Sequence, residues 1–310
     1  MIRTLTRLVV LALLSSAAAS GMAAAHAVDA PGGASLTTWS WEPWAVTPLV
    51  LSAGLYGAGL VRLRARSRSG AVEHGVRAAL FALGWLVTAV ALVSPVDPIG
   101  GELFSMHMMQ HELLMLIAAP ALVLSRPGGV FAWGLPWTGR RALGPLTGGL
   151  RTAWRMATRP LPAWAWHFAV LWGWHVPWLF EAGLHSDLMH ALQHLCFVLV
   201  ALVFWRSVFR ADAGVGAAVF SLFTTAIHAT ILGAMLTLAP SVWYPTYLVA
   251  APRWGLTPLE DQQLGGLIMW VPGGIVYVVA GLAILALALN RGEPSSRRGP
   301  GTADLVRVRP

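Results

Sequence analysis

The sequence predicts an all-α integral membrane protein, a seven-transmembrane helix bundle with its N-terminus outside and its C-terminus in the cytoplasm. Three observations predict this class. The 310 residues are 56% apolar and only 11% charged, whereas an average soluble domain carries about 25% charged residues. The apolar residues fall into runs near the ~20 residues that a helix needs to cross a bilayer. Arginine supplies all 21 basic residues and gathers in alternate loops, which indicates a fixed orientation.

The N-terminus is typical of a secretory signal peptide over residues 1–25. Arg3 and Arg7 precede a short apolar stretch, and small residues follow it, as a cleavage site requires. An uncleaved signal anchor is the alternative. Residues 26–43 are expected to form an outer N-terminal segment, and residues 44–289 a membrane domain. Residues 290–310 are polar and rich in Pro, Gly and Arg, which predicts a disordered cytoplasmic tail.

Seven apolar runs of membrane-spanning length make up the membrane domain. Lipid offers no hydrogen bonds to the backbone, so each run is expected to be helical. The runs are Trp44–Val61, Val76–Val93, Leu103–Leu124, Trp164–Phe180, Leu188–Trp205, Gly216–Leu238 and Leu264–Leu289. Four prolines lie inside them and are expected to kink the helices: Pro48, Pro120, Pro177 and Pro272.

The loops alternate in arginine content. The first, third and fifth loops and the tail carry nearly all the arginines after residue 25, whereas the second, fourth and sixth loops contain only Arg253. Because positive loops stay in the cytoplasm, this pattern places the N-terminus outside. The formal charge of +8 is therefore a signal of orientation and gives no support to a nucleic-acid partner. The single cysteine, Cys196, excludes an intramolecular disulfide and a paired-thiolate metal site.

Two histidine motifs of the same pattern begin the third and fifth spans. Residues 106–111 and 189–194 both fit Met-His-x-x-Gln-His, and both spans run from outside to inside, so the motifs lie at one depth. Residues four apart share a helix face about 6 Å apart along the axis. Each motif therefore projects two imidazoles in one direction. Two facing pairs would form a metal site from His107, His111, His190 and His194.

Four imidazoles in an apolar helix bundle are costly unless something binds them, although a purely structural polar network is the alternative. Neutral imidazoles suit copper, zinc or haem iron. Met108 and Met115 bring thioether sulfur near one pair, and thioether with imidazole favours copper, especially Cu⁺. Core packing is the other reading of these methionines.

Other polar groups are predicted in the outer half of the bundle as additional ligands or supporting groups. These are His175, His185, His228 and Glu112. Glu112 is the one carboxylate well inside a span, and it projects roughly 100° from His111, which favours charge balance or proton handling over ligation. Since neither a Gly-rich phosphate loop nor a nucleophile beside a base is present, we do not expect an enzyme.

Several segments together resemble the CtaG family of cytochrome c oxidase assembly proteins, the multi-span family associated with caa-type oxidases. The segments are Ser94–Pro98, Met106–Leu114, Trp174–Pro177, His185–His194 and Leu259–Gly266 with Met269 and Trp270. The resemblance implies a multi-pass protein of the bacterial plasma membrane that takes part in haem-copper oxidase maturation, with oxidase subunits as partners. In this interpretation Asp261 and Gln262 accept hydrogen bonds from the imidazoles and orient them. The alternative is that the outer loop, residues 239–263, is a plain amphipathic loop on the membrane surface.

Four functions therefore remain open from the sequence. The first is a copper-binding assembly factor that delivers copper from the four-histidine cluster to the oxidase. The second is a haem-binding membrane electron-transfer protein. The third is a transporter of copper ions or protons that uses His228 and Glu112 beneath the outer site. The fourth is a scaffold for oxidase subunits without a metal.

Overall fold

The computed structural model describes residues 33–66, 71–210 and 214–292. Every regular element in these ranges is a helix, which confirms the all-α class. The predicted signal peptide, residues 1–25, lies outside the described residues, as do residues 26–32 and 293–310 of the two predicted terminal segments.

Within the described ranges, six helices are long and apolar enough to cross a membrane: Pro43–Arg66, Val72–Val93, Phe104–Ser125, Asp187–Val208, Val215–Thr237 and Pro258–Asn290. They correspond to six of the seven runs that the sequence singled out. Large apolar side chains such as Phe220, Phe223 and Leu282 are exposed on the outside of the bundle. An apolar surface of this kind is suited to lipid.

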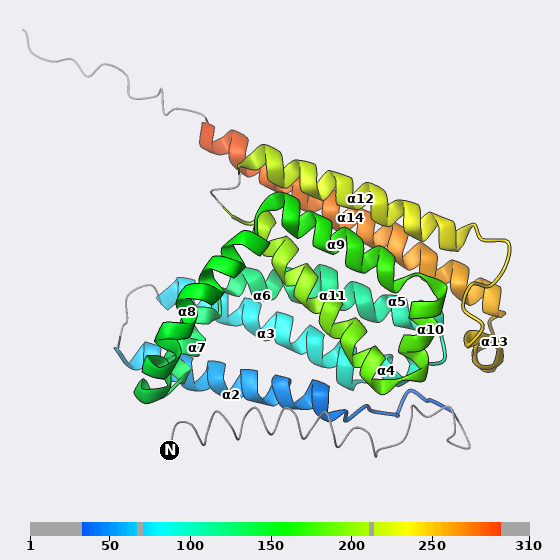
Figure 1. Cartoon of the computed structure of the whole chain (residues 1–310), viewed down its shortest axis with the longest axis horizontal. Coiled ribbons are helices and arrows are strands. Elements are labelled where there is room, and N and C mark those ends of the chain that lie inside the picture. Colours follow the sequence, from blue (N-terminus) through cyan, green and yellow to red (C-terminus); the bar gives the residue numbers. More distant parts are fainter. Residues whose placement is uncertain (1–32, 67–70, 211–213, 293–310) are drawn as a thin grey trace, which may run out of the picture.

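The elements run back and forth between two ends of the bundle (Figure 1). In the first half they are α2 (Pro43–Arg66), α3 (Ala71–Val93), α4 (Val96–Gly100), α5 (Phe104–Glu112), the π-helical turn η3 (Leu113–Ala118), α6 (Ala119–Ser125) and α7 (Gly128–Gly134). In the second half they are α8 (Trp137–Ala157), α9 (Pro160–Trp174), α10 (Pro177–His185), α11 (Asp187–Val208), α12 (Val215–Thr237), α13 (Tyr247–Ala250), the 3-10 turn η5 (Ala251–Trp254) and α14 (Pro258–Gly292).

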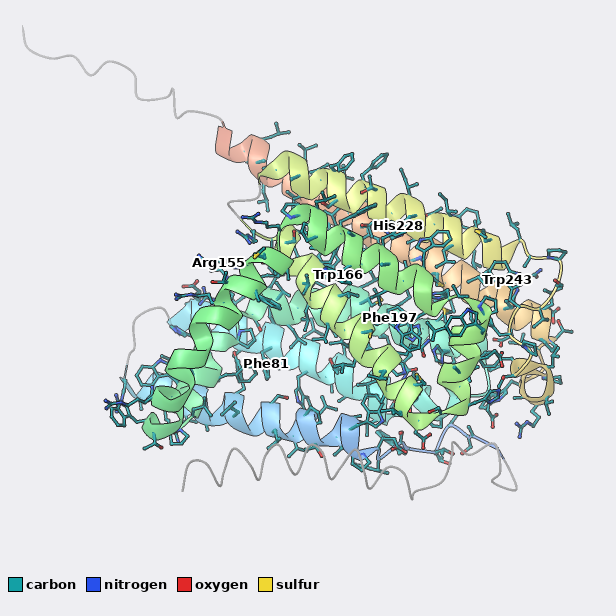
Figure 2. The ribbon with its side chains drawn as sticks, viewed as in Figure 1. Phe81, Arg155, Trp166, Phe197, His228 and Trp243 are labelled. Atoms are coloured by element: carbon teal, nitrogen blue, oxygen red, sulfur yellow. The ribbon has the colours of Figure 1, made fainter. Side chains whose placement is uncertain are left out.

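The two ends of the bundle differ in charge. The arginine end carries α7, α8 and Arg155, and the acidic end carries α4, α10 and α13, with Trp243 beside them (Figures 1 and 2). At the arginine end Arg62 Nη1 donates to the carbonyl of Gly134 at 2.6 Å, and Arg210 Nη1 donates to Thr158 Oγ1 at 3.2 Å. The cytoplasmic loops of the sequence prediction therefore lie together at one end.

The fourth apolar run departs from the prediction of one helix over Trp164–Phe180. Helix α9 ends at Trp174, and α10 starts at Pro177. Proline disfavours helical geometry in the residue before it, and Val176 is extended, with φ −64° and ψ 127°. The 15 residues of α9 extend about 22 Å, short of the ~30 Å hydrocarbon core. The expected kink at Pro177 is therefore a helix end.

The third run keeps its length but changes its winding. The π-helical turn η3 separates α5 from α6, and Pro120 lies directly after it, where it cannot donate a hydrogen bond to the preceding turn. The indole Nε1 of Trp205 donates to the carbonyl of Met115 within this turn at 2.8 Å. Widened turns of this kind accompany functional sites, and this one follows the first histidine motif by two residues.

Helices α12 and α14 pack backbone to backbone. A Cβ placed on Gly233 would lie 2.8 Å from the carbonyl oxygen of Gly266, and one on Gly266 would lie 2.6 Å from that of Gly233. Small residues allow such close approach between membrane helices. In Figure 1 these two helices run side by side along α9, with α11 and α5 beneath. The largest core cluster of buried apolar residues connects the same helices.

Candidate metal centre

Helices α5 and α11 bring the four predicted histidines together. The ring centroids of His107 and His111 lie 4.4 Å apart on α5, and those of His190 and His194 lie 4.3 Å apart on α11. Across the two helices the His107 ring is 5.7 Å from the His190 ring and 5.8 Å from the His194 ring, and the His111 ring is 5.2 Å from the His194 ring. The two pairs therefore face each other at one depth.

Asp97 joins this cluster from α4. One ligand atom from each of Asp97, His190 and His194 lies within 4.8 Å of the others, all three residues are buried, and this group could hold a metal ion. The two Nε2 atoms of His190 and His194 are 2.8 Å apart. The spacing of the histidines did not predict Asp97, which lies in the segment Ser94–Pro98 that resembles the CtaG family. Its position between Pro95 and Pro98, directly after a span, is a further signal in the sequence.

Several buried ring nitrogens of the cluster are available to bind a metal ion. His107 Nε2 and both ring nitrogens of His111 have no hydrogen-bond partner among the described residues. The side-chain amide of Gln193, in the second motif, is likewise buried without a partner. Leaving a buried polar group unpaired costs about 1–3 kcal/mol. A metal ion bound by the imidazoles would remove part of this cost, so the residues present fit a metal.

Gln110, in the first motif, holds the carboxylate of Asp97. Its Nε2 donates to Asp97 Oδ1 and to the carbonyl of Ala91, both at 2.8 Å. Groups that hydrogen-bond a ligand fix its orientation. The glutamine of the first motif therefore positions the carboxylate next to the imidazoles of the second motif.

Asp261, from α14, supports the histidine helix at its beginning. Its Oδ2 accepts from the backbone N–H of Phe104 at 2.6 Å, and its Oδ1 accepts from the N–H and the hydroxyl of Ser105 at 3.0 and 2.5 Å. These N–H groups belong to the first turn of α5, where no intrahelical acceptor is available. The predicted hydrogen bonds of Asp261 to imidazoles are thus replaced by a helix cap. Gln262 instead accepts from the N–H of Trp243 at 2.6 Å.

His175 and Met108 lie at the edge of the cluster. His175 Nδ1 is 2.6 Å from the carbonyl of Leu171 and donates to it, which leaves Nε2 3.5 Å from Met108 Sδ. The ring of His175 is 6.5 Å from that of His111. One thioether and a fifth imidazole therefore adjoin the four central rings.

The remaining predicted site residues lie elsewhere. His185 is exposed and pairs with Glu181 at 3.4 Å. Met115 packs in the core. His228 contacts His167 in the interior, and the carboxylate of Glu112 lies against α14 at Gly273. The sequence pattern could not separate His228 and Glu112 from the cluster, because the residues they contact lie on other helices.

Aromatic side chains cover the acidic side of the cluster. Phe180 lies 5.0 Å from the His107 ring and 4.2 Å from the Tyr244 ring. The hydroxyl of Tyr244 donates to the carbonyl of His175 at 2.9 Å, and that of Tyr247 donates to the carbonyl of Gly100 at 3.0 Å. Burial raises the pKa of both tyrosines above the usual value. They therefore stay protonated donors and fix the loop over the site.

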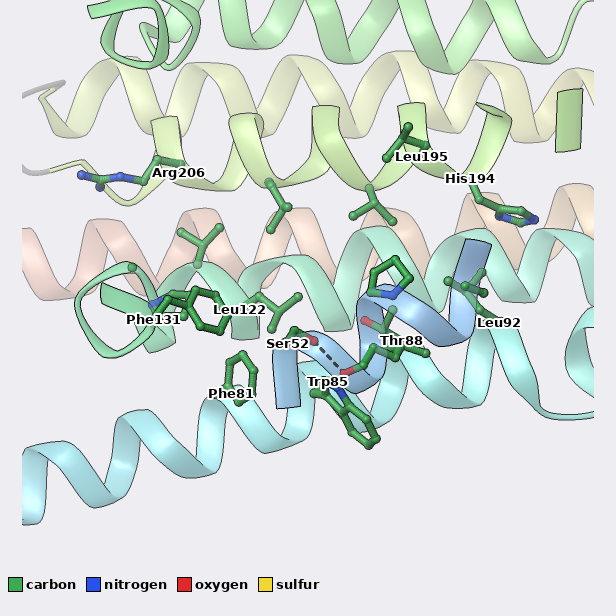
Figure 3. A pocket seen from close by; sticks show the side chains of 18 of the residues that line it. Ser52, Phe81, Trp85, Thr88, Leu92, Leu122, Phe131, His194, Leu195 and Arg206 are labelled. Atoms are coloured by element: carbon green, nitrogen blue, oxygen red, sulfur yellow. Dashed lines mark hydrogen bonds between the residues drawn. The ribbon is translucent and has the colours of Figure 1, made fainter. Parts of the chain in front are cut away.

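An apolar cleft of about 1350 Å³ lies between α2, α3 and α11. His194 lies at one end of the cleft and Arg206 at the other, with Phe81, Trp85 and Leu122 between them (Figure 3). The ring of Trp44 stacks parallel to that of His194, with centroids 6.1 Å apart. Of the four clustered histidines, His194 is therefore the one that lines this cleft, and the ring of Trp44 lies against it.

The fold and the site define a class of protein: a multi-pass helical membrane protein with a buried cluster of histidines and a carboxylate near one end of the bundle. The family model described as cytochrome c oxidase caa3 assembly factor matches residues 54–291. The chain therefore belongs to this family, which confirms the resemblance seen in the sequence.

Two curated relatives are also similar to the chain. They are the uncharacterized protein Mb0105 of Mycobacterium bovis and the uncharacterized protein MT0111 of Mycobacterium tuberculosis. Each is 26% identical over 252 residues, which covers 76% of this chain and 37% of the relative. The chain thus spans a little over a third of the length of these relatives. No solved structure matches it.

Proposed function

We propose that this protein binds copper at His107, His111, His190, His194 and Asp97, and that it assists delivery of the ion to a caa3-type cytochrome c oxidase. The observation that carries the proposal is the convergence of four buried imidazoles and a carboxylate from three helices. Several of the nitrogens lack any hydrogen-bond partner within the described part of the chain. The partner follows from the family's description as an oxidase assembly factor.

The donor set favours copper. Imidazole binds copper and zinc alike, whereas thioether sulfur selects Cu⁺. Met108 places its sulfur 3.5 Å from His175 Nε2 at the edge of the cluster. A site with several imidazoles, one carboxylate and a thioether in reach can hold Cu⁺ with few ligands and Cu²⁺ with more. Zinc is the competing ion in the experiment below.

The geometry does not favour haem. Two axial imidazoles must stand on opposite faces of the macrocycle, so the whole porphyrin has to fit between the facing helices. Here the rings of α5 and α11 lie 5.2 to 5.8 Å apart. Phe180 and Phe197 approach within 5.0 and 4.3 Å of the histidine rings. These phenyl rings occupy space beside the imidazoles that a macrocycle would need, so the arrangement favours a bare ion.

The charge of the two ends supports an orientation in the bacterial plasma membrane. The arginine end is assigned to the cytoplasm by the positive-inside rule. The acidic end, with Glu102, Glu181 and Asp97, then faces outward and attracts cations. Copper would then reach the histidine cluster from the outer side.

The test is copper binding by the purified full chain. We expect elemental analysis and Cu⁺ titration against a chromogenic chelator to find bound copper in the wild type. The variant with alanine at His107, His111, His190 and His194 should lose the tightest copper, and cells producing it should lose caa3 oxidase activity. His74→Ala, on α3 away from the cluster, is the matched control. A wild type that binds no copper, or binds only zinc, would refute the copper assignment, and unchanged oxidase activity in the alanine variant would refute the assembly role.

A further inference from the structure

A second pair of histidines is buried deeper in the bundle. His167 on α9 and His228 on α12 have ring centroids 5.9 Å apart, and both side chains are buried. Figure 2 shows His228 where α12 passes α9 and α14. His167 precedes His175 by eight residues, about 12 Å along the helix axis. This pair therefore lies well below the four-histidine cluster.

The inner pair has more nitrogen donors than hydrogen bonds. His167 Nδ1 and both ring nitrogens of His228 have no partner in the part of the chain that the structure describes. The remaining nitrogen, His167 Nε2, is 3.3 Å from the hydroxyl of Tyr277 on α14. An ordinary structural network would satisfy these nitrogens, because each buried polar group left unpaired is costly. Three unpaired nitrogens on two facing rings indicate a missing ligand.

Aromatic rings enclose the pair. The His228 ring lies 5.1 Å from Phe168 and 6.0 Å from Trp164, both edge to face, and the His167 ring lies 4.8 Å from Phe204. Aromatic faces attract cations and exclude water. A weakly hydrated ion suits such aromatic surroundings, whereas magnesium and calcium require oxygen ligands.

A buried carboxylate, Glu112, lies against α14 one helical turn from Tyr277. A Cβ on Gly273 would lie 3.2 Å from Glu112 Oε2, and Tyr277 is the residue one turn further along α14. Glu112 Oε2 is itself buried without a hydrogen-bond partner among the residues described. Burying an uncompensated charge in a membrane protein is expensive, so one carboxylate balances one positive charge. A monovalent ion fits better than a divalent one.

We propose that His167 and His228, with the hydroxyl of Tyr277, form a second cation site that takes a soft monovalent ion of the Cu⁺ class. Imidazole is a copper ligand, and Cu⁺ accepts the low coordination number that two imidazoles provide. The identity of the ion rests on the proposed function, whereas the existence of the site rests on the inner residues alone. The protein then holds copper at two depths of the bundle.

The experiment counts Cu⁺ ions bound to the full chain, purified without oxygen and titrated against a chromogenic Cu⁺ chelator. We expect the wild type to hold one equivalent more than His167→Phe/His228→Phe, in which phenylalanine preserves the ring volume. The variant with alanine at the four outer histidines should keep one equivalent, and His74→Phe should bind as the wild type does. Tyr277→Phe, which removes only the hydroxyl, should keep the equivalent with weaker affinity.

The outcomes separate the two proposals. If the inner double variant binds as much copper as the wild type, the inner site is refuted while the outer one stands. If the outer variant loses nothing, the proposed function is refuted while the inner site stands. Should the double variant fail to fold, His228→Asn must still lower the count by one equivalent. X-ray absorption of the copper held by the outer variant must show imidazole nitrogen; a sulfur-dominated shell would overturn the proposal.

Discussion

The carboxylate of Asp261 caps the first turn of α5 at Ser105, 156 residues earlier in the chain. Asp261 Oδ1 accepts from both the hydroxyl and the N–H of Ser105, at 2.5 and 3.0 Å, and all of these atoms are buried. A negative charge at a helix N-terminus is stabilising. The contact holds α14 against the turn of α5 that carries His107. It therefore fixes the position of the histidine helix along α14.

Replacement of this cap is therefore expected to weaken the bundle. Asp261→Ala leaves the N–H groups of Phe104 and Ser105 buried without an acceptor, at a cost of about 2 kcal/mol or more in the free energy of unfolding. Ser105→Ala removes one of the three hydrogen bonds and should cost about 1 kcal/mol. Chemical unfolding in detergent micelles, followed by circular dichroism, measures both. Equal losses in the two variants would show that the backbone cap contributes nothing.

The carboxylate of Asp97 is expected to determine metal affinity. Asp97→Asn keeps an oxygen that can accept from Gln110 Nε2, so the side chain stays in place, but it removes the negative charge beside His190 and His194. We expect copper affinity to fall at least about 10-fold, the scale seen when ligand or supporting groups of a metal site are changed. The measurement is a competition titration with a chelator.

Glu102→Gln is the matched control for that titration. Glu102 is buried at the same end of the bundle, and its carboxylate is held by the N–H of Ala34 at 2.6 Å and by Trp254 Nε1 at 2.8 Å. These contacts do not include the histidines or Gln110. If copper affinity falls equally in both variants, the ion is attracted by the overall negative charge at this end of the bundle. Asp97 would then have no direct role in binding.

The sequence predicted those features that depend on local spacing. Residues four apart share a helix face, so the pairing of His107 with His111 and of His190 with His194 could be predicted, and equal depth predicted that the pairs meet. The contribution of Asp97 could not be predicted, because it depends on how α4 packs against α5 and α3 and so brings the carboxylate near His190 and His194. For the same reason Asp261 was assigned to imidazoles, whereas its partners are backbone groups of α5.

The break between α9 and α10 is a second feature that the sequence did not predict. Pro177 was expected to kink one continuous span, since proline is tolerated inside membrane helices. Pro48 and Pro272 do lie inside continuous helices. At Pro177 the residue before it adopts an extended conformation, and a new helix starts with proline in the first turn, which proline favours. Composition alone does not distinguish these two outcomes.

The contact between α12 and α14 predicts a strong dependence on glycine size. Gly233→Ala places a methyl group 2.8 Å from the carbonyl oxygen of Gly266 and 2.9 Å from the backbone nitrogen of Trp270. Since backbone atoms cannot rotate aside, the helices must separate, at about 1–3 kcal/mol. Thermal unfolding in micelles should show the loss.

Gly57→Ala provides the comparison for that glycine. Gly57 lies in α2, and a Cβ there meets nothing within 4 Å. Alanine in this helix should be neutral or stabilising by about 0.5–1 kcal/mol. If both variants lower stability equally, the loss at Gly233 reflects something other than the helix contact.

The hydroxyl of Tyr247 is expected to make stability depend on alkaline pH. It donates to the carbonyl of Gly100 at 3.0 Å, and burial, followed by the charges of Asp261 and Glu181, raises the pKa of Tyr247 well above its usual value. In the unfolded chain the pKa of tyrosine is about 10. The folded state therefore favours the protonated phenol, and its contribution is complete below pH 10 and is lost as the pH rises toward the folded-state pKa.

Tyr247→Phe tests this dependence. Below pH 9 the variant should be less stable than the wild type by about 1 kcal/mol, because the Gly100 carbonyl loses its donor. Above pH 10 the wild type should lose stability faster than the variant, since only the wild type has this phenol to deprotonate, so the gap should narrow and then reverse. Unfolding at pH 8, 10 and 11 measures the gap. If the free energies of unfolding of the two proteins depend on pH in the same way, the hydroxyl of Tyr247 has the same pKa in the folded and unfolded chains. The loop over the metal centre is then not held by a buried donor.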